Sequence, residues 1–245
     1  MGEMGELKTE GIVLRYADYK DADRMLTLLT PDYGLISVSA RGVRRQNAKL
    51  RFAAELFTYG SYMLNDKNGR YALMGCVLKD SFYSLREDID KMCAASAMVE
   101  ITNYAGTQQP QPELVELLRG CLFTLCSGTP PKALLALFIA RLLKISGYLP
   151  GIEYCISCGS KAEYFIPGEG GICRKCAQKT GTAGLIMLES QTPGFIDGCV
   201  CSENETFLCE AEKKTTDNAF MLLVRHMQIC FDCQFKSVGY FLPQL

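Results

Sequence analysis

Four cysteines in the second half of the chain have the spacing of a metal site. Cys155 and Cys158 form one C-x2-C pair, Cys173 and Cys176 form a second, and residues 159–172 separate the pairs. Each C-x2-C turn offers two thiolates from one tight loop, and two such turns complete the tetrahedral shell that zinc requires. Four thiolates leave no position open for water, so the sequence predicts one structural, non-catalytic zinc ion per chain.

A third C-x2-C pair, Cys230 and Cys233, falls in the expected final helix. Cysteines three positions apart on a helix are more often two buried small side chains than metal ligands. A second metal site remains the alternative, and its further candidate ligands are Cys199, Cys201 and Cys209. The remaining cysteines occupy apolar positions and are expected in the core: Cys76, Cys93, Cys121 and Cys126.

The sharpest charged feature is a basic run at residues 41–51, which holds five basic residues and no acidic one. Its own neighbours in the sequence cannot neutralise it, so contact with nucleic-acid phosphate is expected; the alternative is a solvated loop. The candidate phosphate contacts are Arg41, Arg44, Arg45, Lys49 and Arg51. Aromatic residues available for base stacking are Tyr16, Tyr19, Tyr33 and Phe52.

The elements that would position this run are short strands. Alternating apolar residues and turn signals predict strands over residues 11–16, 25–30, 34–40, 55–64 and 70–78. An antiparallel unit of five strands has the size of an OB-fold barrel, whose outer face can hold nucleic acid. The basic run joins the third and fourth strands.

Helical spacing begins after residue 80, where Ser84 and Glu87 have the pattern of a capping box. Helices are expected over residues 114–125 and 130–147, and a final one over 217–233. The expected fold class is α+β: an N-terminal five-stranded OB-fold barrel, an α-helical domain and an inserted four-cysteine zinc element. The expected boundaries are 1–80 for the barrel, 81–150 for the helical domain, 151–184 for the zinc element and 185–245 for a C-terminal segment packing on the helical domain.

Composition and motifs exclude several function classes. The 245 residues include 26 basic and 27 acidic ones and carry a net charge of −1, so nucleic-acid binding must be local. The longest apolar run, residues 133–140, is too short to span a membrane, and the first residues lack a signal-peptide pattern, so a protein inside the cell is expected. A single histidine, His226, and the lack of phosphate-loop, zincin and serine-hydrolase motifs argue against an enzyme.

Several strings, taken in order, resemble the bacterial recombination mediator family RecO over nearly the whole chain. They are TEGIVL at residues 9–14, GLISV at 34–38 followed by ARGVRR at 40–45, DSFYSLR at 80–86, and FIARLLKISGYLP at 138–150, which leads into the first C-x2-C pair. Each string alone is weak, but their order and spacing together are specific.

The resemblance implies a cytoplasmic, nucleoid-associated protein that binds single- and double-stranded DNA and anneals complementary strands. It also implies contact with the acidic C-terminal tail of single-stranded-DNA-binding protein and, together with RecR, loading of RecA. On this basis the basic run contacts phosphate, the four cysteines hold zinc, and Arg141 is a candidate contact for the acidic tail; a helix-surface arginine is the alternative for Arg141. The alternative function is a zinc-stabilised protein-interaction adaptor without strong intrinsic DNA binding.

Overall fold

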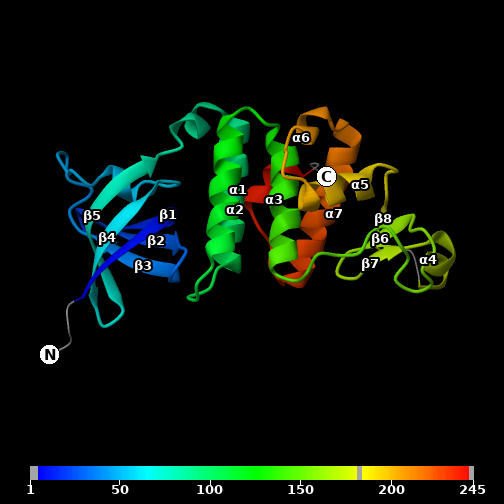
Figure 1. Ribbon diagram of the computed structural model, residues 1–245, viewed down its shortest axis with the longest axis horizontal. Helices are drawn as coiled ribbons and strands as arrows, with labels where there is room; N and C mark the ends of the chain where they lie inside the picture. Colours follow the sequence, from blue (N-terminus) through cyan, green and yellow to red (C-terminus); the bar gives the residue numbers. More distant parts are fainter. Residues whose placement is uncertain (1–4, 181–183, 243–245) are drawn as a thin grey trace. The chain divides into compact units, whose positions relative to one another are not determined.

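The chain folds as two units, Met1–Cys126 and Ser127–Leu245, in a computed structural model that describes residues 5–180 and 184–242 (Figure 1). The first unit holds the five strands and two helices. The second holds the remaining helices and the cysteine-rich element. The four-part division expected from the sequence is finer than these two units and stays a prediction.

The five strands of the first unit close into a barrel in the order β1-β2-β3-β5-β4. They are β1 (Gly5–Tyr19), β2 (Asp23–Thr30), β3 (Gly34–Ala40), β4 (Tyr59–Lys67) and β5 (Arg70–Asp80). The long β1 pairs with β4 through its first half and with β2 through its second. A bulge between Val13 and Arg15 bends β1 between the two partners, as closure requires. The predicted α+β class with an N-terminal five-stranded barrel is confirmed.

Alternate residues of each strand fill the barrel interior with apolar side chains, including Leu26, Leu28, Val38 and Leu64. Tyr62 is also fully buried, and its hydroxyl donates a 3.2 Å hydrogen bond to the carbonyl oxygen of Ala53. Such packing excludes water and fixes the strand register, because a shift of one residue would turn every apolar side chain outward. The outward side chains of the strands are therefore fixed in position as well.

Two details of the barrel differ from the sequence prediction. The barrel is not wholly antiparallel, because β3 and β5 pair in parallel at Val38 with Tyr71 and at Ser39 with Ala72. The fourth strand begins at Tyr59 and not at residue 55. Its expected first residues belong to the long β3–β4 connection, which includes the short helix η1 (Phe52–Ala54). Phe57 is buried like a strand residue, but its backbone is left-handed, which ends any strand at that point.

The predicted capping box is wrong. Ser84 and Glu87 lie in the short helix η2 (Tyr83–Glu87), and α1 (Ile89–Ala105) begins only after it. Asp88 caps α1 instead, because its carboxylate accepts hydrogen bonds from the backbone N–H groups of residues 90 and 91. α2 (Pro112–Cys126) packs against α1 with its leucine stripe buried, as its spacing predicts.

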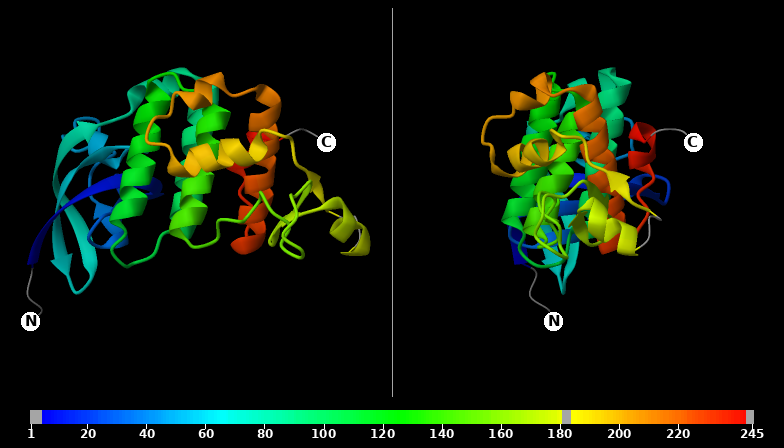
Figure 2. Two further views of the ribbon diagram at one scale, coloured as in Figure 1. Left: turned by 45° about the vertical axis from the view of Figure 1, so that its right-hand side comes forward. Right: turned by 90° about the vertical axis from the view of Figure 1, so that its right-hand side faces the viewer.

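The second unit is built on three helices that pack against one another: α3 (Pro131–Ile145), α5 (Thr192–Cys201) and α7 (Lys213–Cys230). Figure 2 shows α5 crossing the other two. The short helices α6 (Phe207–Glu210) and η3 (Ser237–Phe241) complete this part. No helix among the described residues has the length and apolar character needed to cross a membrane.

The final helix ends three residues earlier than predicted. α7 stops at Cys230, and Asp232 adopts a left-handed backbone conformation that breaks the helix. Cys230 and Cys233 therefore do not lie three positions apart on one helix, as the sequence analysis assumed. The cysteine-rich element follows α3 and contains β6 (Tyr164–Ile166), β7 (Gly170–Ile172), β8 (Ile186–Met187) and α4 (Arg174–Thr180), with the strands in the order β7-β6-β8.

Candidate nucleic-acid interface and metal centre

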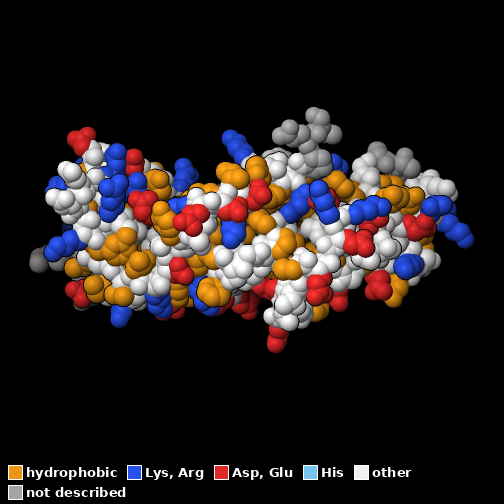
Figure 3. All heavy atoms as spheres, turned by 90° about the horizontal axis from the view of Figure 1, so that it is seen from above, with side chains coloured by type: hydrophobic (Ala, Val, Ile, Leu, Met, Phe, Trp, Pro, Cys, Tyr) orange, Lys and Arg blue, Asp and Glu red, His pale blue; other side chains and the backbone are white. Residues whose placement is uncertain are grey.

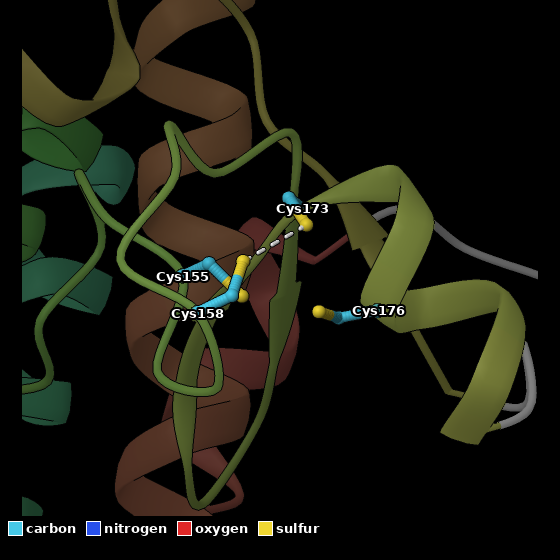
Figure 4. Close-up of side chains that lie close together, drawn as sticks. All are labelled: Cys155, Cys158, Cys173 and Cys176. Atoms are coloured by element: carbon cyan, nitrogen blue, oxygen red, sulfur yellow. Dashed lines mark hydrogen bonds between the residues drawn. The ribbon is translucent and has the colours of Figure 1, made fainter.

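The four predicted cysteines converge on one point. Their Sγ atoms all lie within 4.8 Å of one another, and those of Cys158 and Cys173 are 3.6 Å apart. Figure 4 shows Cys155 and Cys158 entering from one loop, and Cys173 and Cys176 entering from the start of α4. A zinc ion with Zn–S bonds of about 2.3 Å requires sulfurs at this kind of separation. Among described residues no other group of histidine, cysteine or acidic side chains is close enough to hold a metal ion.

The electrostatics of the cluster also fit a cation. A hydrogen bond from the Cys173 backbone lowers the pKa of the Cys155 thiol to about 6, and Ser160 lowers the pKa of Cys158. The neighbouring sulfurs, Cys158 first, raise the pKa of Cys176 to about 12. The surroundings thus favour the thiolate forms of Cys155 and Cys158, whereas the neighbouring sulfurs oppose ionisation of Cys176. A bound divalent cation removes that opposition, because a coordinating thiol is deprotonated.

The chain's single histidine joins the cysteine-rich element to α7. His226 is buried, and its Nδ1 accepts a 3.1 Å hydrogen bond from the backbone N–H of Gly168, in the β6–β7 turn. Its Nε2 lies 2.8 Å from the carbonyl oxygen of Tyr148, so the neutral ring donates a hydrogen bond to that oxygen. Both ring nitrogens are used in the fold, as expected for a structural histidine.

The basic run lies in the connection between β3 and β4, as predicted, and the β1–β2 hairpin holds it in place. The backbone N–H of Gly42 donates to the Asp23 carboxylate at 2.8 Å, and that of Arg44 donates to the Ala22 carbonyl at 3.0 Å. The run has no acidic residue of its own, as the sequence shows, but Arg44 has a partner outside the run, because Asp18 lies 3.3 Å from its guanidinium. Asp18 is too far away in the sequence for a local charge count to include it.

The other four candidate residues of the run are exposed, and no carboxylate among the described residues forms an ion pair with them: Arg41, Arg45, Lys49 and Arg51. Arg45 and Lys49 line a hollow of about 400 Å³ together with Arg41. Arg41 also lines a larger groove of about 860 Å³ on the outer face of the barrel. The two hollows therefore meet at Arg41.

The larger groove adds two basic residues that sequence reasoning missed. Ser37 and Ser39 of β3 line it, and the β4–β5 hairpin contributes Lys67 and Arg70. No acidic residue in the described part of the chain lines either hollow. The hairpin resembled only a turn in the sequence, but the loop between strands 4 and 5 of an OB-fold faces the same ligand as strands 2 and 3, which is the signal that could have found them. We call this surface the basic groove: Arg41, Arg45, Lys49, Lys67 and Arg70.

The four aromatic candidates for base stacking differ in how much of each ring is accessible. Tyr19 is 51% exposed at the tip of the β1–β2 hairpin, with the Lys20 ammonium 5.3 Å from its ring centroid. The Arg24 guanidinium covers the ring of Tyr16 at 3.9 Å, and Phe52 packs against the barrel core. Tyr33 is partly exposed. Figure 3 shows basic and acidic side chains interspersed over the face it displays, in keeping with a local site and not a global field.

Arg141 is engaged inside the second unit. Its guanidinium donates to the carbonyl oxygens of Cys199 at 2.9 Å and Ser202 at 2.8 Å, and to the carboxylate of Glu205 at 3.1 Å. The first two contacts satisfy carbonyls at the C-terminal end of α5, where unpaired acceptors need donors. The arginine thus joins α3 to α5 and to the turn that follows it.

Comparison with known proteins covers both units. The sequence model of the family described as recombination protein O N terminal matches residues 4–82. The model described as recombination protein O C terminal matches residues 86–190. Together the two matches include the barrel, the basic run and all four clustered cysteines.

Individual relatives agree with the family models. A protein of Bacillus pumilus is 34% identical over 178 residues, which is 71% of this chain and 69% of the relative. One from Acetivibrio thermocellus is 32% identical over 232 residues, which is 92% of each chain. One from Bacillus subtilis is 32% identical over 177 residues, which is 70% of this chain and 69% of the relative. Each of these relatives bears the name DNA repair protein RecO.

Proposed function

The chain belongs to the RecO family of DNA repair proteins, and on this premise we propose that it is a non-enzymatic recombination mediator that binds single- and double-stranded DNA. In this proposal it anneals complementary strands and, with RecR, helps load RecA onto DNA coated by single-stranded-DNA-binding protein, whose acidic tail it contacts. It acts in the bacterial cytoplasm, at the nucleoid.

The observation that carries the proposal is the basic groove. Two joined hollows on an OB-type barrel present five cationic side chains and, among the residues that the structure describes, no carboxylate. Phosphates of a nucleic-acid backbone need this kind of lining, because each neutralised phosphate releases condensed counterions. The exposed Tyr19 beside Lys20 offers a face on which a base can stack. No element among the described residues resembles a recognition helix, so we propose binding without base-specific readout.

The metal centre supports this role indirectly. We propose that Cys155, Cys158, Cys173 and Cys176 hold one structural zinc ion, which fixes the loop of the first C-x2-C pair against α4. The guanidinium N–H groups of Arg141 already donate to acceptors within the second unit. Arg141 is therefore a weak candidate for contact with the acidic tail of single-stranded-DNA-binding protein.

The second candidate function is the zinc-stabilised adaptor, in which the barrel contacts a protein and holds DNA only weakly. Exposed apolar side chains on β4 and β5 favour it: Met63, Met74, Val77 and Leu78 are 48%, 54%, 64% and 44% exposed. Phosphate contacts do not need such residues, whereas apolar surface in a protein interface is ordinary. Capture of single-stranded-DNA-binding protein without measurable oligonucleotide affinity would favour this candidate.

The deciding experiment measures fluorescence anisotropy of a labelled single-stranded oligonucleotide against the full chain at several salt concentrations. The test variant is Arg41→Ala/Arg45→Ala/Lys49→Ala, and the charge-matched control is Lys144→Ala/Lys213→Ala/Arg225→Ala, which removes three exposed basic residues of the second unit. We expect salt-sensitive binding by the wild type and the control. In the test variant, the slope of log affinity against log salt concentration should become shallower by about two. Equal binding by both variants would place the nucleic-acid site outside the basic groove.

A further inference from the structure

The tip of the β1–β2 hairpin forms hydrogen bonds with both ends of the β3–β4 connection, which carries the basic run. At the near end, the backbone contacts of Gly42 and Arg44 described above fix the first turn. At the far end, Arg24 donates to the Ala54 carbonyl and to the Glu55 carboxylate, each at 2.9 Å. The hairpin tip and the basic run therefore form one rigid assembly, and contacts between them are built into the fold.

Within this assembly one carboxylate bridges two arginines. Asp18 Oδ1 lies 3.1 Å from Nε of Arg24, and Asp18 Oδ2 lies 3.3 Å from Nη2 of Arg44. The side chain of Asp18 is 49% exposed and that of Arg44 is 34% exposed, so solvent and ions reach this pair. Arg24 is only 14% exposed and also donates to the Ala54 carbonyl and the Glu55 carboxylate, which makes its contact structural. Arg44 has one further acceptor, the Lys20 carbonyl oxygen, which lies 3.2 Å from its Nη1 and leaves Nη2 to Asp18. The contact with Arg44 is the one that another anion can replace.

We propose that Asp18 is a built-in competitor of nucleic-acid phosphate for Arg44. The inference rests on the proposed function and names a regulatory feature of the same site. A carboxylate and a phosphate present the same kind of oxygen acceptors to a guanidinium, so only one of them can occupy its outer edge. In the free protein Asp18 occupies Arg44; a bound phosphate displaces it, and Asp18 stays on Arg24.

This arrangement divides the basic run into two classes of residue. Arg41, Arg45 and Lys49 have no carboxylate partner among the described residues and are ready to contact phosphate. Arg44 contributes only after its own ion pair has opened. The exchange lowers the net gain in affinity that a phosphate obtains at Arg44.

The test compares Asp18→Asn with Asp21→Asn in the anisotropy assay. Asp21 is an exposed residue of the same hairpin tip, and no described partner contacts it. Both variants change the net charge from −1 to 0, so the general field changes equally. We expect Asp18→Asn to bind about two- to five-fold more tightly than Asp21→Asn, the range of an exposed ion pair, with a steeper salt slope by up to about 0.7.

The double variant Asp18→Asn/Arg44→Gln assigns the gain to the correct partner, and it should lose the extra affinity. Should Asp18→Asn unfold, the single variants Arg44→Gln and Arg45→Gln replace it: we expect Arg44→Gln to weaken binding less. Equal affinities of Asp18→Asn and Asp21→Asn, or a gain that survives in the double variant, would overturn the competitor proposal alone. No salt-dependent binding by any folded variant would overturn the proposed function with it, whereas binding by Asp18→Asn only would support the competitor.

Discussion

The backbone N–H of Gly168 donates a hydrogen bond to Nδ1 of His226, which lies 58 residues later in the sequence. This contact fixes the proton of the neutral ring on Nε2, where the Tyr148 carbonyl accepts it. Protonation of Nδ1 would place two donors against each other. The folded protein therefore holds His226 neutral, and burial lowers the pKa of its ring.

The stability of the second unit should fall as the solution becomes more acidic. Because the folded-state pKa of His226 is below its ordinary value of about 6.5, the unfolded chain takes up a proton first. The contribution of neutral His226 to the free energy of unfolding is complete above about pH 6.5. It is lost as the pH falls toward the lower pKa that His226 has in the folded protein. His226 is the chain's only histidine. Calorimetry between about pH 5.5 and 7.5 should show a steeper decline of Tm for the wild type than for His226→Gln; parallel declines would contradict the assignment.

Removing one thiolate should empty the metal centre. We expect the wild type to contain about one zinc per chain and Cys173→Ser to contain far less, because three thiolates no longer close the tetrahedral shell. Cys209→Ser is the control, since Cys209 is exposed and lies outside the cluster. Metal analysis gives the stoichiometry, and limited proteolysis should show new cleavage within residues 151–180 only in Cys173→Ser. Equal zinc content in both variants would show that the cluster is not the metal site.

Replacing Arg141 should destabilise the second unit. In Arg141→Ala two carbonyls and the Glu205 carboxylate lose a partly buried partner, which should lower the free energy of unfolding by about 2 kcal/mol. Arg141→Lys should not restore it, because one ammonium cannot reproduce the planar guanidinium. Lys144→Ala, an exposed change on the same helix, is the control. Denaturant unfolding measures the effect; unchanged stability combined with lost binding of the acidic tail peptide would instead favour Arg141 as a partner contact.

The hairpin between β4 and β5 should contribute to binding. Arg70→Ala should weaken oligonucleotide binding and reduce the salt slope by about 0.7, since one phosphate contact is lost. Lys8→Ala is the matched control, because Lys8 is exposed on the barrel and does not line the basic groove. Salt-dependent anisotropy compares the two. An equal effect of both variants would mean that only the general charge of the barrel matters at this position.

The sequence predicted features that local spacing controls. The two C-x2-C pairs predicted the cluster of four cysteines, since each pair is fixed by one tight turn and only the meeting of the two turns depends on the fold. Strand alternation gave the five-stranded barrel, because each strand has one buried face. Leucine spacing over residues 114–125 gave α2 for the same reason.

Features that depend on distant contacts could not be predicted. The partner of Arg44 lies 26 positions earlier, across the β1–β2 hairpin, so a charge count along the basic run missed Asp18. Lys67 and Arg70 join the basic groove only because the barrel closes. The capping box failed because Asp88 competes with Ser84 and carries a carboxylate in reach of two free N–H groups.

The central claim is that nucleic acid binds along the basic groove of the barrel. Hydrogen–deuterium exchange of the full chain, with and without a saturating single-stranded oligonucleotide at low salt, tests it most directly. We expect slower exchange in residues 36–52 and 65–74, which carry the basic run, the outer edge of β3 and the β4–β5 hairpin. Protection confined to residues 127–242, with the barrel unchanged, would contradict the claim.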